Sequence, residues 1–71
     1  MTRKITVGQF KNDPESVEGE KVYLKTFNGW QEVDYVTYDG WAHCPRDNGG
    51  YGRSYMVPSN ETLVVGEKPQ A

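Results

Sequence analysis

Two turn dipeptides, Asn28-Gly29 and Asp39-Gly40, constrain the fold of this chain more than any other feature. Each favours the positive φ angles of a tight hairpin turn. Both lie between runs in which apolar and polar residues alternate, the pattern of a half-buried strand. We therefore predict a three-stranded meander over residues 21–44, with Asn28-Gly29 in a type I′ turn and residues 30–38 as the central strand.

In the rest of the chain, apolar and polar residues also alternate over short runs. These runs predict further strands over residues 4–10, 54–57 and 62–65. Residues 11–20 combine Asn, Asp, Pro, Ser and Gly, so we expect a loop there. Pro14 favours one helical turn within that loop, with Asp13 as its cap.

These elements predict an all-β fold of five or six antiparallel strands with at most one short helical turn. A small barrel or two orthogonally packed sheets would satisfy this order, and a barrel best hides the sheet edges. A chain of 71 residues can build one compact core. We expect a single domain over residues 1–66, with the aromatic side chains supplying most of its core, and a frayed tail over residues 67–71.

The stretch from Asp39 to Val65 resembles the second half of an SH3 domain. It has a Trp-Ala-His strand from Trp41, a glycine-rich distal-type loop, and Tyr55-Met-Val-Pro-Ser-Asn60 before the last strand. The resemblance implies an SH3-like barrel. The family places a tyrosine of its proline-binding surface after Pro-Ser-Asn, whereas Glu61 follows here, so binding of proline-rich peptides is less expected than the fold.

The charge balance excludes a strongly basic, phosphate-binding protein. Eight Lys and Arg residues stand against ten Asp and Glu, a formal net charge of −2. The acidic residues between Asp13 and Glu20 are expected in a solvated loop. A single cysteine allows no intrachain disulfide, and no run resembles a secretory signal or a membrane span, so we expect a cytoplasmic protein without membrane contact.

Two arrangements of residues could carry chemistry. His43 and Cys44 are adjacent and should point to opposite faces of a strand, and no further Cys or His joins them, so we expect no metal and no cofactor. A buried thiol beside a surface imidazole is the expected arrangement, and a thiolate activated by Arg46 is the alternative. Glu32 and Asp34 should lie on one face of a strand. They could act there as an acid-base pair, or they could simply form the solvated side of the strand. We expect no enzyme.

A binding surface is the more promising hypothesis. The loop from Arg46 to Arg53 combines glycines, forked Arg donors and Tyr51, and each Trp follows a hairpin glycine. A flexible loop, and tryptophans that cover the barrel ends, are the structural alternatives. The expected partner-binding residues are Trp30, Trp41, Arg46, Tyr51, Arg53 and Tyr55.

Three functions follow, in order of preference. The first is a non-enzymatic protein-binding module, such as a viral or mobile-element accessory protein that modulates a host protein. The second is a barrel that binds single-stranded nucleic acid or RNA through stacked aromatics. The third is a small enzyme or one subunit of an oligomeric active site. Homo-oligomerisation stays open.

Overall fold

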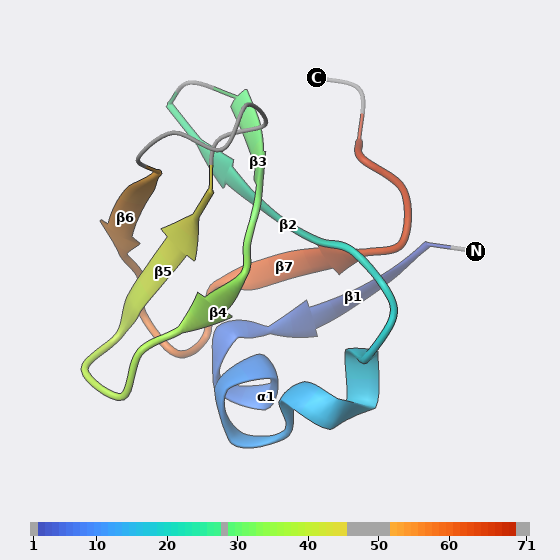
Figure 1. Cartoon of the computed structure of the whole chain (residues 1–71), viewed down its shortest axis with the longest axis horizontal. Helices are drawn as coiled ribbons and strands as arrows, with labels where there is room; N and C mark the ends of the chain where they lie inside the picture. The colour runs from blue at the N-terminus through green and yellow to red at the C-terminus, as the bar shows by residue number, and fades with distance from the viewer. Residues whose placement is uncertain (1, 28, 46–51, 70–71) are drawn as a thin grey trace.

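The computed structural model describes residues 2–27, 29–45 and 52–69. In chain order its elements are β1 (Arg3–Thr6), α1 (Val7–Asn12), the 3-10 helix η1 (Pro14–Val17), β2 (Val22–Thr26), β3 (Gly29–Glu32), β4 (Tyr35–Val36), β5 (Trp41–Cys44), β6 (Arg53–Met56) and β7 (Thr62–Val65) (Figure 1). The predicted all-β class is confirmed.

The strands form two antiparallel sheets. One has the order β1-β7-β2-β3 and the other the order β4-β5-β6. The described residues form seven strands where five or six were predicted. In this part of the chain the sheets do not close into the barrel that we preferred, and two separate sheets, the alternative arrangement, are observed. Helix α1 contacts both β1 and β4, and Figure 1 shows it below the two sheets. It therefore packs against one strand of each sheet.

The first strand is shorter than predicted, because a helix replaces the second half of residues 4–10. Thr6 and Gln9 form a capping box at its start. The Gln9 N–H donates to Thr6 Oγ1 at 3.1 Å, and the Thr6 N–H donates to Gln9 Oε1 at 2.8 Å. The helix then buries Val7 and Phe10, which are three residues apart on one face. The alternation of apolar residues misassigned a segment that the Thr-x-x-Gln motif could have identified.

The helical turn predicted at Pro14 is confirmed as η1. The side chain of Asp13 does not cap it, contrary to expectation. Instead the Asp13 carbonyl accepts hydrogen bonds from the backbone N–H and the hydroxyl of Ser16, at 3.2 and 2.8 Å. The turn places Val17 in the core.

The predicted central strand over residues 30–38 is divided between the two sheets. The Val33 N–H donates to the Val22 carbonyl at 2.7 Å, whereas the next N–H, that of Asp34, donates to the His43 carbonyl at 2.8 Å. Consecutive residues therefore belong to different sheets. The predicted meander is correct in its hairpin connections, and wrong in placing all three strands in one sheet.

The first hairpin has its turn one residue earlier than predicted. Gly29 has a positive φ of 98°, but it pairs with Thr26 as the first residue of β3. Gly29 is therefore a paired strand residue and not a central residue of the turn, so the predicted type I′ turn centred on Asn28-Gly29 is not formed. Asn28 itself lies outside the described residues.

The second hairpin, at Asp39-Gly40, is confirmed with a three-residue loop. The Gly40 N–H donates to the Thr37 carbonyl at 3.0 Å, and the Thr37 N–H donates to the Trp41 carbonyl at 2.8 Å. Gly40 takes a φ of 95°, the left-handed conformation that closes such loops.

The core between the sheets and α1 is mainly aliphatic. Its buried members are Val7, Phe10, Val17, Val22, Leu24, Val33, Ala42, Cys44, Val57, Leu63 and Val65. The expectation that aromatic residues supply most of the core is therefore wrong. Tyr23 and Val64 are buried as a cross-strand pair that lies outside this cluster.

The capping box provides a test of the helix that alternation missed. Gln9→Ala removes the acceptor of the Thr6 N–H, and we expect it to lower the free energy of unfolding by about 1 kcal/mol in chemical denaturation. Gln9→Glu keeps a side-chain oxygen that can accept the Thr6 N–H, so we expect its free energy of unfolding to stay close to that of the original protein. Equal losses in both variants would contradict the capping role.

Candidate functional site

The structure separates the residues predicted for a binding surface. Trp41 lies on the outside of β4-β5-β6, Trp30 lies on the other sheet, and Tyr55 packs against the core from β6. Arg53 is exposed at the start of β6. Arg46 and Tyr51 lie outside the described residues. The two tryptophans therefore do not form one patch.

The sheet β4-β5-β6 has an outer face made by Tyr35, Trp41, His43, Ser54 and Met56. The register places Trp41 opposite Met56, and His43 opposite Tyr35 on one side and Ser54 on the other. Their neighbours in each strand point inward, as shown by buried Ala42. We call these five residues the outer face.

Large apolar groups remain exposed on this face. Met56 is 69% exposed, Tyr35 51% and Trp41 37%. The Trp41–Met56 pair is of the non-hydrogen-bonded kind, in which opposite side chains stand closest. An exposed apolar patch on a small domain is typical of an interaction site.

A β-bulge brings two neighbouring residues onto one imidazole. His43 is the register partner of Tyr35, yet its carbonyl also accepts the N–H of Asp34, so two residues face one. The Tyr35 ring stacks on His43 at 5.0 Å between centroids and 17° between planes. The Asp34 carboxylate lies 3.5 Å from Nδ1 of His43. In a regular strand Asp34 and Tyr35 would point to opposite faces.

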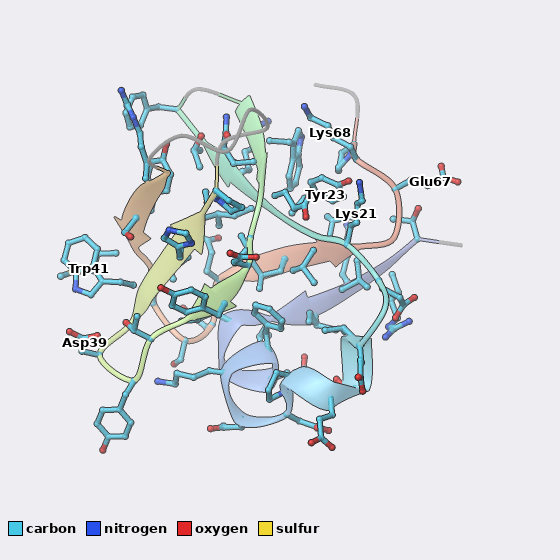
Figure 2. The ribbon with its side chains drawn as sticks, in the orientation of Figure 1. Lys21, Tyr23, Asp39, Trp41, Glu67 and Lys68 are labelled. Atoms are coloured by element: carbon cyan, nitrogen blue, oxygen red, sulfur yellow. The ribbon has the colours of Figure 1, made fainter. Side chains whose placement is uncertain are left out.

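The turn between β4 and β5 fixes the position of Trp41. The hydroxyl of Thr37 accepts the Trp41 N–H at 2.9 Å and donates to the carboxylate of Asp39. Figure 2 shows Asp39 and Trp41 on the same side of the molecule. Tyr38 is fully exposed at the turn, and its carbonyl accepts a hydrogen bond from Nζ of Lys11 at 3.4 Å. The turn is thus held to α1.

The sheet β1-β7-β2-β3 presents a different surface around Trp30. The half-buried indole has Nζ of Lys25 5.8 Å from its ring centre. Two hollows meet at Trp30, and their walls include Lys4 and Lys25 on one side and Lys21 and Lys68 on the other. Figure 2 shows Lys21, Tyr23 and Lys68 gathered on the side of the molecule away from Trp41. We call this surface the lysine face.

Neither chemical arrangement forms a reactive centre. Glu32 and Asp34 face different partners, since Glu32 lies 4.0 Å from Nζ of Lys21 and Asp34 faces His43. Cys44 is buried as predicted. Burial, with a smaller contribution from the Asp34 carboxylate, raises the pKa of its thiol to about 11. The thiol is neutral at pH 7 and is a core group.

The described residues contain neither a metal-binding cluster nor a membrane-spanning helix. No group of three or more His, Cys, Asp and Glu side chains is placed to hold a metal ion. No helix in the same residues is long and apolar enough to cross a membrane.

Comparison with known proteins gives no further guide. No family model, curated protein or solved structure matches the chain. The resemblance to SH3 domains therefore stays a prediction, and what the chain binds has to be inferred from its own surfaces.

Sequence reasoning missed four of the five members of the outer face, namely Tyr35, His43, Ser54 and Met56. Alternation along the predicted strand could have placed His43 on the same face as Trp41. The hairpin at Gly40 could have placed Tyr35 opposite His43. The pairing of Trp41 with Met56 could not be read locally, because the two residues lie far apart in the sequence.

The raised pKa of Cys44 predicts a dependence of stability on alkaline pH. Between the unfolded value of 9.0 and the folded value of about 11, the unfolded chain loses the thiol proton and the folded chain keeps it. The free energy of unfolding therefore falls as pH rises through this window, by about 2–3 kcal/mol from this group.

Comparison with Cys44→Ala isolates that contribution, because the other titrating groups are common to both proteins. Denaturation at pH 8, 9, 10 and 11 should show the original protein losing more stability than the variant. Parallel pH profiles would contradict a buried, neutral thiol.

Proposed function

We propose that this protein is a non-enzymatic protein-binding module that uses the outer face. The observation that carries the proposal is the Trp41–Met56 pair, which leaves apolar surface exposed on the outer face of β5 and β6. Tyr35, stacked on His43, extends the patch across β4. Aromatic residues and Met are enriched where proteins contact each other.

The charge around this face favours a protein over a nucleic acid. Asp34 and Asp39, both exposed, border the outer face on the side of β4 and its turn. The two carboxylates would repel the phosphate groups of a nucleic acid. They do not oppose contact between the outer face and the apolar surface of a protein. Occupying a partner's surface is also how a domain of this size would modulate a host protein, the accessory role expected from the sequence.

Trp41→Ala tests the proposal in affinity capture from the source cell. We expect at least about a thirtyfold loss of affinity for the captured protein, as for a central aromatic at an interface. Trp30→Ala is the matched control, because it removes the same side chain from the other sheet. Capture that survives Trp41→Ala and fails with Trp30→Ala would overturn the choice of face.

A second function is supported by the lysine face. Four lysines surround the hollows that meet at Trp30, and basic residues beside an aromatic ring suit single-stranded nucleic acid. Glu32 and Glu61 line the same hollows and weaken this surface for phosphate. We therefore place it second.

Fluorescence quenching by a single-stranded oligonucleotide tests this second function. Binding on the lysine face should quench Trp30 and weaken steeply as salt is raised from 50 to 200 mM, by about tenfold or more. The Trp41→Phe variant, in which Trp30 is the remaining tryptophan, should retain the signal and Trp30→Phe should lose it. No quenching at low salt would remove nucleic acid as a ligand of this face.

A further inference from the structure

Strand β6 has an unpaired edge whose hydrogen-bonding groups can be identified. The Val57 N–H donates to the Gly40 carbonyl at 3.0 Å, in register with the β5-β6 ladder. Hydrogen-bonded and non-hydrogen-bonded pairs alternate along such a ladder. Tyr55 and Arg53 therefore bond to β5, while the backbone N–H and C=O groups of Ser54 and Met56 point away from it.

Nothing in the described part of the chain pairs with this second side of β6. The edge at β1, in contrast, carries a charged side chain that is bonded to a neighbouring segment. There the Arg3 guanidinium crosses to η1 and the following loop, with hydrogen bonds to the Ser16 carbonyl at 3.0 Å and to Glu20, whose carboxylate lies 2.8 Å away. A charged tether of this kind protects an edge from further pairing. The edge of β6 has no such tether among the described residues.

The side chains of β6 also restrict which segment can pair with this edge. Arg53 is its one charged residue, is exposed, and has no carboxylate within ion-pair distance among the described residues. Met56, three residues later, belongs to the outer face beside Trp41. A strand added along β6 in the antiparallel direction would meet Met56 first and Arg53 last.

We propose that β6 receives an extended segment of a partner protein as an added antiparallel strand, with an apolar residue opposite Met56 and an acidic residue three positions later opposite Arg53. This inference rests on the proposed protein-binding function and specifies how the partner binds. Backbone bonds to Ser54 and Met56 supply general affinity, and the apolar and acidic positions supply selectivity. The segment therefore has the pattern apolar-x-x-acidic.

A second copy of this chain fits the edge less well. The β6 sequence Arg-Ser-Tyr-Met contains no acidic residue, so two antiparallel β6 strands leave both Arg53 side chains without a carboxylate opposite. Charge complementarity thus favours a different partner over self-pairing.

The test uses the full chain and a displayed library of random eight-residue peptides as the probe. We expect enriched peptides to share the pattern apolar-x-x-acidic. Binding of an enriched peptide should slow amide hydrogen exchange at Ser54 and Met56, because their N–H groups become bonded. The exchange measurement is made on the unaltered protein, so it does not depend on any variant folding.

Two pairs of variants separate the backbone from the side chains. Ser54→Pro removes an outward N–H without removing a bond to β5, and should weaken the enriched peptide about tenfold, whereas Ser54→Ala should bind normally. Arg53→Glu should weaken it about fivefold, and a peptide with Lys in place of the acidic residue should recover the loss.

The outcomes distinguish this inference from the proposed function. Peptides that need Trp41 but leave exchange at Ser54 and Met56 unchanged would overturn strand addition and leave the binding module intact. A library with no enriched peptide would overturn strand addition, whereas the proposed function is overturned by capture that survives Trp41→Ala. Slowed exchange at these two amides in the protein alone, with dimers in sedimentation, would overturn the assignment to a different partner and identify a second copy.

Discussion

The change of sheet between Val33 and Asp34 is the constraint on which the rest of the structure depends. A buried backbone N–H has to be hydrogen-bonded, and these two adjacent groups find their acceptors in β2 and β5, on different sheets. The chain thereby passes from one sheet into the other as one extended run from β3 to β4 (Figure 1). Val33 then points into the space between the two sheets and joins the core.

The same change of sheet creates the outer face. Because Asp34 and Tyr35 both stand opposite His43, the imidazole carries a stacked ring on one side and a carboxylate at Nδ1. The side chains of β5 that alternate with buried Ala42 and Cys44 must then be Trp41 and His43. The bulge gives the Asp34 N–H an acceptor in β5, and it also sets the positions of the aromatic side chains on the outer face.

A small domain that leaves such side chains exposed loses stabilisation. Apolar surface contributes about 25 cal/mol per Å² when buried, and domains of this size have little stability in reserve. Yet the core consists largely of valines and leucines, while Trp41, Tyr35 and Met56 stay outside it. Burial against the proposed partner would recover this free energy. The exposed Trp41–Met56 pair and the edge of β6, which has no partner strand among the described residues, therefore support the same proposal.

Local chemistry in the sequence determined the strands around both hairpins, the helical turn at Pro14 and the burial of Cys44, because each depends on residues within a few positions. It misplaced the end of β1, where the Thr6–Gln9 capping box outweighs an alternating pattern. It marked Trp41 as a site residue but grouped it with Trp30. Only the tertiary structure decided that these two lie on different sheets, that Met56 faces Trp41, and that Ser54 and Met56 point their backbone outward. Those facts depend on which strands pair and in what register, and pairing is a contact between distant segments that no local pattern encodes.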